Sequence, residues 1–447
     1  MKRQLITPLA LHKRTTRCTM MDNLVRLFTP NLVLSYDERL DPERLKRALV
    51  RVLADYSEYA GRLSRVDGDL SIEHGTGGAI FEITESTLPN AAFQSRTNAN
   101  SWKLACPTLS VVGILRGKTP LFAARVTQTP NGSVLGVTWH HTVGDVYSTM
   151  LLVRAWALAY RDQPYEKPTE VSDRSAYLSE RLPRSSGELT RWRLLSWREV
   201  FGVLGYWLTH PGRRVKLEFS WSEIDAFRAA ATRDNPVTAH DALCAHLVLM
   251  LRRLDSATRS HLTVAVNYRK RAGLPAILLG NMTDMVSLTV NAGDDAASIA
   301  SGLRLCINEF ATGPLSHHEM LKLRAAHPGA LQRLRYWNDY VPGSTVAITS
   351  VLGLQDVVFQ ATAAACAEAR PSTSDSREMN WIYESPDRTG LVVDMWLPSP
   401  VADRVDQESK SRARLAPVVG GAVRCRLQPW CRAEQLTAAS ASGSRAT

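Results

Sequence analysis

The chain has 447 residues, 45% of them hydrophobic, which is enough for two domains with ordinary apolar cores. No apolar run is long enough to cross a membrane, and the basic start Met1–Asn23 lacks the apolar segment of a secretory signal. We therefore expect no membrane span. The net charge of +11 favours an anionic partner, although much of the excess lies from Ser409 onward, where a solvated basic tail is the better explanation.

The cysteines and glycines exclude several common classes of protein. Seven cysteines are scattered without a CxxC pair, which favours a reducing compartment, the cytoplasm, and indicates no zinc or other metal site. No phosphate-binding glycine loop, dinucleotide fingerprint or internal repeat occurs. The basic patches lack the interleaved aromatic residues of an RNA-binding module, so nucleic acid is not an expected partner.

The first half predicts strands that alternate with helices. Asp41 and Pro42 are typical of an N-cap and a first helical turn, and apolar residues at helical spacing continue that helix to Tyr56. The turn at Pro130-Asn131-Gly132 leads into a buried strand. The strands expected in this half are Val33–Tyr36, Leu70–Ile72, Leu109–Leu115, Leu121–Val126 and Val134–Trp139.

The stretch Gly136–Asp145 is the most informative in the chain. Its apolar strand runs directly into His140 and His141, Gly144 breaks the pattern, and the apolar segment Val146–Tyr160 follows with the length of a helix. A histidine between a strand and a helix can be held in one orientation with a pKa near neutrality, as a general base requires. The competing interpretation is a structural histidine, with Asp145 only capping the helix.

The second half repeats this rhythm after a polar connection. Gln163–Gly187 is rich in Pro, Ser, Glu and Arg and predicts a surface crossover, and Trp192–Trp207 predicts a helix. Beyond Pro400 the apolar periodicity disappears, which favours a disordered tail. The expected parts are an N-terminal basic extension (1–20), a first domain (21–162), a crossover linker (163–214), a second domain (215–405) and a basic tail (406–447).

Several short motifs occur in one order along the chain. They are Tyr59-Ala60-Gly61-Arg62-Leu63, His141-x-x-x-Asp145, Thr238-x-x-Asp241-Ala242-Leu243, Asn267-x-Arg269-x-Arg271, Gly280-Asn281 and Thr349-Ser350. In this order and spacing they resemble the BAHD family of CoA-dependent acyltransferases from about Asp22 to Pro400. The resemblance implies an α/β fold of two chloramphenicol-acetyltransferase-like domains, with mixed sheets flanked by helices and a channel between them.

The resemblance also implies an activity. His141 would deprotonate the hydroxyl or amine of a small-molecule acceptor, which attacks the thioester of acyl-CoA, and would return the proton to the departing thiolate. Acyl-CoA would be a co-substrate, with no bound cofactor and no metal, in a monomeric cytoplasmic enzyme of secondary metabolism.

The same resemblance assigns supporting roles. Asp145 would pair with Arg269, or with Arg271 as second choice, and brace the turn at Gly144, although the two arginines also fit a solvated strand end. Arg233, in the loop before the helix of Ala242, is the candidate for the CoA phosphates, and its competing interpretation is an ordinary exposed arginine.

Three positions depart from the family pattern. Val146 replaces a common glycine, Val351 replaces a tryptophan after Thr349-Ser350, and only Phe359 matches the DFGWG motif, within Asp356–Thr362. These departures keep two alternatives open. One is a condensation domain of the peptide-synthetase type, which shares the His-His-x-x-x-Asp pattern and uses carrier-bound thioesters. The other is a binding protein with the same fold and impaired catalysis.

Overall fold

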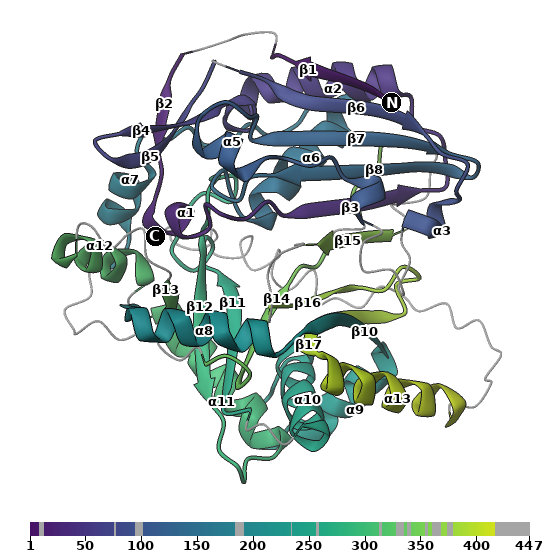
Figure 1. The fold of residues 1–447 in the computed structure, drawn as a ribbon, viewed down its shortest axis with the longest axis vertical. Helices are drawn as coiled ribbons and strands as arrows, with labels where there is room; N and C mark the ends of the chain where they lie inside the picture. The colour runs from purple at the N-terminus through teal and green to yellow at the C-terminus, as the bar shows by residue number, and fades with distance from the viewer. Residues whose placement is uncertain are drawn as a thin grey trace, which may run out of the picture. The chain divides into compact units, whose positions relative to one another are not determined.

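The computed structural model describes residues 1–8, 13–75, 77–93, 102–183, 192–233, 235–255, 259–312, 315–327, 335–337, 341–353, 356–359, 368–372 and 379–415. Within Met1–Asp406, the described residues form two six-stranded sheets with helices packed on them (Figure 1). In the described part of the chain, no helix combines the length and the apolar character that crossing a membrane requires.

The first sheet belongs mainly to the first half of the chain. Only β6 and β7 pair in parallel, and the other neighbours are antiparallel, so the sheet is mixed. The strands in spatial order are β1 (Lys2–Ile6), β6 (Ala79–Glu85), β7 (Phe122–Thr129), β8 (Gly132–Trp139), β3 (Asn31–Tyr36) and β15 (Glu368–Ser372). Helices α2 (Pro42–Asp55) and α6 (Val146–Tyr160) pack against each other and join its core.

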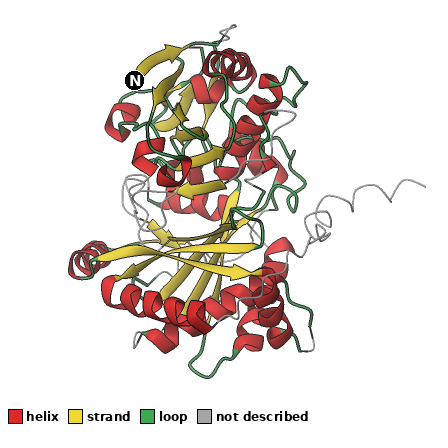
Figure 2. Ribbon diagram, turned by 90° about the vertical axis from the view of Figure 1, so that its right-hand side faces the viewer, coloured by secondary structure: helices red, strands yellow, loops and turns green. Residues whose placement is uncertain are grey.

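The second sheet is also mixed, since β14 pairs in parallel with both β11 and β16. Its strands in spatial order are β10 (Gly212–Ser220), β17 (Gly390–Pro398), β16 (Met379–Glu384), β14 (Thr345–Ser350), β11 (His261–Asn267) and β12 (Thr283–Thr289). Helices line one face of this sheet in Figure 2. They include α9 (Trp221–Ala231), α10 (Ala239–Leu254), α11 (Ala296–Thr312) and the start of α13 (Ser399–Leu415), whose Val401 and Val405 join the same core.

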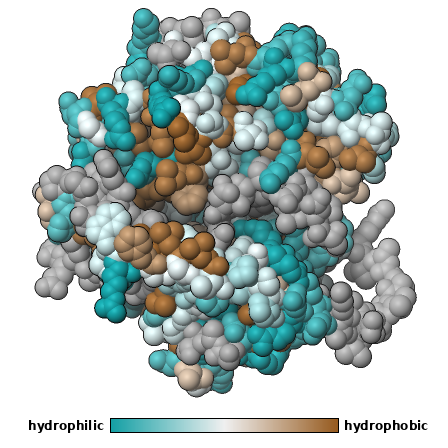
Figure 3. Space-filling model, in the orientation of Figure 1, coloured by the Kyte–Doolittle hydropathy of each residue, from teal (hydrophilic) through white to brown (hydrophobic). Residues whose placement is uncertain are grey.

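Shorter elements surround the two sheets. Strands β2 (Thr15–Arg17), β5 (Asp69–Glu73) and β4 (Arg62–Val66) form a small sheet, and β9 (Trp192–Leu194) pairs with β13 (Arg335–Trp337). The other helices of the described residues are α1 (Met20–Leu24), η1 (Ser57–Ala60), α3 (Asn90–Phe93), α4 (Trp102–Ala105), α5 (Val111–Leu115), α7 (Arg174–Arg181), α8 (Trp197–Thr209) and α12 (Ser316–Ala326). Helix α8 leaves Phe201 and Leu208 exposed, and apolar surface lies over it in Figure 3.

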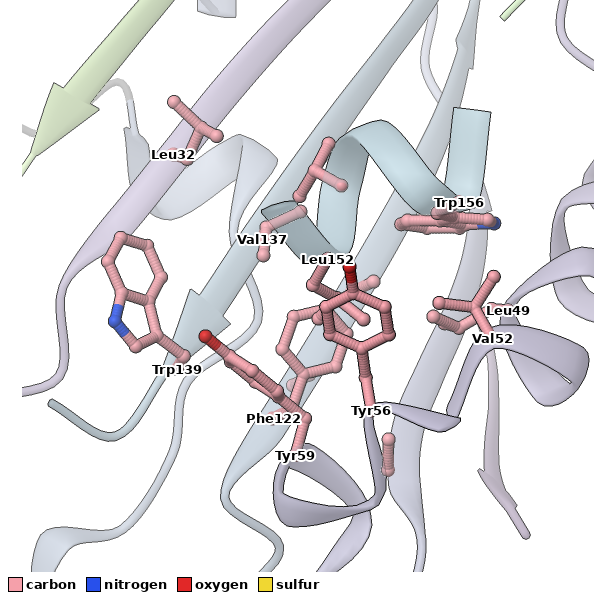
Figure 4. Packing of buried hydrophobic residues seen from close by; sticks show 14 of the residues in the cluster. Leu32, Leu49, Val52, Tyr56, Tyr59, Phe122, Val137, Trp139, Leu152 and Trp156 are labelled. Atoms are coloured by element: carbon pink, nitrogen blue, oxygen red, sulfur yellow. The ribbon is translucent and has the colours of Figure 1, made fainter. Parts of the chain in front are cut away.

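Strand β8 is buried along its whole length, as its continuous apolar run predicts. Gly136 is required within it, because a Cβ there would lie 2.1 Å from the carbonyl oxygen of Ala105. At its end, Trp139 pairs in register with Phe122, whose ring packs edge-to-face on Tyr59 with centroids 5.7 Å apart (Figure 4). This aromatic packing fixes the position at which β8 ends.

The second half also contributes to the first core. Strand β15 pairs with β3, and the Tyr36 hydroxyl donates to the Val357 carbonyl at 3.3 Å. Phe359 is 1% exposed and packs edge-to-face on Tyr36, Trp156 and Tyr160, each at 5.6 Å between centroids. The one residue that matches the DFGWG motif is therefore part of the core of the other sheet.

Two sequence expectations about the first domain are wrong. Residues 2–6 are not part of an extension but form β1, which pairs with β6. Leu109–Leu115 is not a strand, because the Ser110 hydroxyl accepts the Gly113 N–H at 3.1 Å and caps the short helix α5. An apolar run of this length fits either structure, and the cap decides it.

The linker and the tail also differ from expectation. The expected helix Trp192–Trp207 is split into β9 and α8, and Arg174–Arg181 is a helix within the expected crossover. Asp406 does not begin a disordered tail, since α13 continues to Leu415, with Val401 and Val405 buried. Arg213 also pairs with Asp406 at 2.6 Å. Residues 416–447 lie outside the described residues.

Candidate active site

The turn between β8 and α6, residues 140–144, carries the two histidines, and we call it the histidine turn. Backbone hydrogen bonds hold its start: His140 N–H donates to the Leu121 carbonyl at 2.8 Å and His141 N–H to the Phe28 carbonyl at 2.9 Å. At its end, Trp139 Nε1 donates to the Gly144 carbonyl at 3.0 Å. The turn therefore has a defined path before any charged group is considered.

Gly144 is required by a close approach. A Cβ at this position would lie 2.6 Å from the Cβ of Ser148, in the first turn of α6. Real side chains do not approach that closely, so any larger residue would move the turn away from the helix. Gly144 therefore has a structural role and not a catalytic one. Its position agrees with the sequence analysis, which placed it where the strand ends and the helix begins.

The two adjacent histidines have different environments. His140 is fully buried, its Nε2 lies 2.8 Å from the Arg26 carbonyl, and burial lowers its pKa to about 4. His141 is half-buried, and its Nδ1 has no hydrogen-bond partner within the described part of the chain. Burial lowers the pKa of His141 as well, while its own backbone and Asp145 act in the opposite direction. The Nδ1 of His140 also lacks a partner, so the two histidines differ in exposure and in the contact of His140 Nε2 with the Arg26 carbonyl.

Asp145 has two structural functions at once. It caps α6, because its Oδ1 accepts the Ser148 N–H at 2.8 Å and the Ser148 hydroxyl at 2.9 Å. It also forms a bidentate pair with Arg269, with Oδ2 to Nη1 at 2.9 Å and Oδ1 to Nη2 at 3.2 Å. Although burial opposes it, the Arg269 guanidinium holds the pKa of Asp145 below its usual value. We call Asp145, Ser148 and Arg269 the Asp145 cluster.

Arg269 connects this cluster to the second half of the chain. It follows β11 and donates from Nε to the Leu278 carbonyl at 2.9 Å and from Nη2 to the Gly280 carbonyl at 2.8 Å. Its side chain is 3% exposed. The pairing of Asp145 with Arg269 is the arrangement that the resemblance implied, and the catalytic importance of the pair stays a prediction.

Two other candidate residues lie elsewhere. Arg271 donates from Nη1 to the Ile307 carbonyl of α11 at 2.9 Å and lies over the Phe310 ring. The partner of Asp145 is therefore Arg269, and Arg271 joins α11 to the end of β11. Arg233 is 64% exposed in its side chain and pairs with Asp295, which precedes α11.

Sequence reasoning missed a second buried ion cluster at the histidine turn, formed by Asp22, Glu58 and Arg174. Arg174 Nη1 donates to Asp22 Oδ2 at 3.1 Å, and Nη2 donates to Glu58 Oε2. Arg174 is 1% exposed and Asp22 0% exposed. We call these three residues the Arg174 cluster. The available signal was weak: a lone Asp22 after two methionines, and a Glu58 next to the Tyr59–Leu63 motif.

Asn281 joins the two clusters. Its backbone N–H and its Nδ2 donate to Asp22 Oδ1 at 3.1 and 2.7 Å, and Nδ2 also donates to the His141 carbonyl at 2.8 Å. The preceding Gly280 carbonyl accepts from Arg269. Within the described residues, no group of three or more His, Cys, Asp or Glu side chains is arranged to hold a metal ion. The site offers an imidazole, held through its backbone, for proton transfer.

Comparison with known proteins shows which family the chain belongs to. The family model described as "Transferase family" matches residues 18–299, more than half of the chain. A 129-residue segment is 30% identical to hydroxycinnamoyl-CoA:5-hydroxyanthranilate N-hydroxycinnamoyltransferase HHT1 of Avena sativa, and covers 28% of this chain and 29% of that enzyme. A second match, to agmatine hydroxycinnamoyltransferase 1 of Oryza sativa subsp. japonica, has 27% identity over 251 residues. This match covers 52% of this chain and 55% of that enzyme.

The fold resembles that of solved acyltransferase structures. Vinorine synthase matches with a TM-score of 0.70 and 18% identity, over 92% of this chain and 97% of that one. TRI101 of F. graminearum, in complex with ethyl coenzyme A, matches with a TM-score of 0.69 and 15% identity, over 90% and 99% of the two chains. These likenesses confirm the predicted fold of two α/β domains.

The matches to curated relatives are partial, since this chain spans about a third to about half of their length. The family model nevertheless covers the histidine turn, Asp145, Arg269 and Asn281 together. The chain therefore belongs to the Transferase family, the BAHD-type acyltransferases that its motifs resemble.

Proposed function

We propose that this protein transfers an acyl group from acyl-CoA to the amine or hydroxyl of a small molecule, with His141 as the general base. The observation that carries the proposal is the contrast within the histidine turn. His141 is half-buried and its Nδ1 has no hydrogen-bond partner among the described residues, while the backbone around it is hydrogen-bonded. The Nδ1 of His140 is also unpartnered, but that ring is fully buried and its Nε2 lies against the Arg26 carbonyl. A base needs both a free nitrogen and a fixed direction.

The reaction follows from this arrangement. Neutral His141 takes the proton from the acceptor O–H or N–H as the acceptor attacks the thioester carbonyl. The tetrahedral intermediate then breaks its C–S bond, and the imidazolium gives the proton to the departing CoA thiolate. Burial lowers the pKa of His141 from its ordinary value of 6.5, which keeps the imidazole neutral at pH 7. The rate should therefore fall only as the pH drops below this lowered pKa.

Asp145 has a supporting role in this proposal. Its two oxygens accept hydrogen bonds from Ser148 and Arg269, and Oδ2 also accepts the Met282 N–H at 3.1 Å. A carboxylate with these partners is committed to holding the turn and the start of α6. We propose that it braces the turn instead of taking part in proton transfer.

The relatives suggest finer substrate classes. Two of them are named as hydroxycinnamoyltransferases, one acting on 5-hydroxyanthranilate and one on agmatine. Both names describe transfer to a nitrogen-bearing acceptor, so we propose an aromatic acyl-CoA donor and an amine acceptor as the first pair to test. We also propose that the protein is a cytoplasmic monomer and that it acts in secondary metabolism. In the same proposal, Arg233 lies near the CoA phosphates.

The test is release of free CoA thiol by the purified full chain. Acetyl-, malonyl-, benzoyl- and hydroxycinnamoyl-CoA should each be offered with panels of amines and alcohols, and products identified by mass. We expect acceptor-dependent thiol release with at least one pair and its loss in His141→Ala. CoA-thioester binding without thiol release under all conditions would contradict the proposal and favour a binding protein.

A second candidate is supported by one comparison. The starter condensation domain of rhizomide synthetase matches with a TM-score of 0.56 and 13% identity, over 89% of this chain. His140-His141-x-x-x-Asp145 also follows the condensation pattern in all but its last position. An acyl group on a carrier protein should be a poor donor if our proposal is right. A carrier-bound donor that is used far faster than its CoA thioester would favour the condensation class.

A further inference from the structure

The Arg174 cluster is buried, and the attraction within its ion pairs is a weak reason for burying its charges. Removing two carboxylates and a guanidinium from water is expensive, and replacing such clusters by apolar residues is often neutral or stabilising. Stability alone is therefore a weak reason for Asp22, Glu58 and Arg174 to be charged. The remaining hydrogen bonds of Arg174 indicate another reason.

Arg174 binds the histidine turn with both terminal nitrogens. Nη1 contacts Asp22 and, at the long distance of 3.5 Å, the Thr142 carbonyl. Nη2 contacts Glu58 and donates to the Val143 carbonyl at 3.0 Å. Each nitrogen thus contacts one carboxylate and one turn carbonyl. The carboxylates hold the guanidinium plane, and the plane sets the direction of two peptide groups.

The adjacent peptide group is fixed through the same cluster. Asp22 accepts two hydrogen bonds from Asn281, which donates to the His141 carbonyl. The Thr142 hydroxyl donates to the Asp22 backbone carbonyl at 3.1 Å. Three consecutive carbonyls, of residues 141 to 143, therefore point toward groups held by Asp22. Fixed peptide planes on the C-terminal side of His141 fix the direction of its Cα–Cβ bond.

The chain makes room for this arrangement at Gly280. Gly280 has a φ of +120°, and a Cβ there would lie 3.2 Å from Cδ of Arg174. A lysine could not replace Arg174, because one ammonium cannot reach two carboxylates and two carbonyls in the plane of a fork. The sequence Gly280-Asn281 thus supplies space for Arg174 and the amide that connects it to His141.

We propose that Arg174 is a positioning residue for acyl transfer: through the Thr142 and Val143 carbonyls, and through Asp22 and Asn281, it aims the His141 imidazole at the reacting proton. This inference rests on the function proposed above. It requires that Arg174 acts on the rate of the chemical step and that it makes no contact with the acyl-CoA phosphates.

The main test is the double variant Arg174→Met with Glu58→Gln. It removes one positive and one negative charge, so no unpaired guanidinium or Glu58 carboxylate remains in the core, while Asp22 keeps its bonds to Asn281 and Thr19. We expect kcat to fall about 10- to 100-fold, with the KM for acyl-CoA changed less than about threefold. Arg174→Lys should lie close to the double variant, since a point charge does not restore the fork.

The matched control is Arg125→Met with Glu82→Gln. Arg125 Nε donates to Glu82 Oε2 at 2.7 Å between β7 and β6, away from the histidine turn. Removing this pair lowers the charge count in the same way and should leave kcat within about twofold of the wild type. A full kcat in the Arg174 double variant, or an equal loss in the control, would overturn the inference while the proposed function stands.

A spectroscopic arm separates the two proposals. In protein with ¹³C-labelled histidine, the His141 ring signal, assigned with His141→Ala, should shift or broaden in the Arg174 double variant and stay unchanged in the control. If the wild type transfers no acyl group, the proposed function fails, and an unmoved His141 signal then also overturns the positioning role. A changed signal in an inactive protein would support the positioning alone.

Discussion

The histidine turn is held by two buried ion clusters that work in different ways. The Asp145 cluster acts through side chains at the end of the turn: one carboxylate caps α6 and binds Arg269 from the second half. The Arg174 cluster acts on the backbone, since both terminal nitrogens of Arg174 contact turn carbonyls. One cluster therefore fixes where the helix starts, and the other fixes which way the peptide groups face.

The comparison predicts different consequences of damage. Loss of the Asp145 cluster should separate α6 from β11 and lower the stability of the protein as well as its activity. Balanced removal of the Arg174 cluster should lower kcat more than stability, because the turn keeps its other hydrogen bonds. Four changes, ordered from the largest expected effect to the smallest, test this contrast.

The largest effect should come from the residue that both clusters support. His141→Ala should lower kcat about 100- to 10,000-fold, because the acceptor loses its general base, while thermal unfolding stays near that of the wild type. His140→Gln is the matched control. The His140 ring contacts the Arg26 carbonyl and is fully buried, so its replacement should affect folding more than kcat. Equal losses of kcat in the two variants would contradict the assignment of His141 as the general base.

The second test breaks the Asp145 cluster. Asp145→Asn or Arg269→Met alone leaves an unpaired buried charge and should each cost about 3–5 kcal/mol of unfolding free energy. The double variant should cost less than the sum, as measured by urea unfolding, because the two groups interact. The control cycle pairs Asp145→Asn with Arg271→Met. Arg271 binds α11, so that cycle should be additive; additivity in the Arg269 cycle would show that the observed pair has no energetic coupling.

The residues in these two tests lie in parts of the molecule that could be predicted from the sequence. Strand β8, helix α6 and the break at Gly144 follow from local apolar periodicity, which depends on neighbouring residues alone. The Asp145–Arg269 pair was expected because both residues lie in motifs whose order resembles a family. The catalytic role of His141 is still a prediction, since the structure gives the position of the residue and not a reaction.

The parts that were missed depend on contacts between distant residues. Arg174 meets Asp22 and Glu58 across 152 and 116 residues, from a polar segment that reads as a linker. Its charge gives no sign of burial when the chain is read locally. Helix α13 was missed for a related reason: Val401 and Val405 are too few to stand out until they join the core of the second sheet.

The third test measures how the free energy of unfolding depends on pH through His74, a buried histidine near Glu58 of the Arg174 cluster. His74 lies next to Ser57, with its Nδ1 2.8 Å from the Ser57 hydroxyl, and burial lowers its pKa to about 3, with Arg14 acting in the same direction. Between pH 6.5 and pH 3, His74 is therefore protonated in the unfolded chain but neutral in the folded chain. The free energy of unfolding falls as the pH drops from about 6.5 toward 3. Between pH 7 and pH 5, His74 should account for about 2 kcal/mol of that loss.

The variant His74→Gln isolates this contribution. It should remove about 2 kcal/mol of the difference in unfolding free energy between pH 7 and pH 5, although its stability at pH 7 is lower. His210→Gln, at the exposed end of α8, is the control and should keep the whole difference. If His74→Gln retained the wild-type pH dependence, acid sensitivity would have to come from other groups, and His140 would be the first to examine.

The smallest effect concerns an arginine that belongs to neither cluster. Arg233 is exposed and pairs with Asp295, so it lacks the burial that gives Arg269 and Arg174 their fixed positions. If Arg233 binds a CoA phosphate, Asp295 competes for it. Arg233→Ala should then raise the KM for acyl-CoA a few-fold with kcat unchanged, and Asp295→Asn should lower that KM. Both effects should vanish with an acyl-pantetheine donor, which lacks the nucleotide phosphates. The same KM in all three proteins would exclude Arg233 from the donor site and leave the CoA phosphates to other cations of this basic chain.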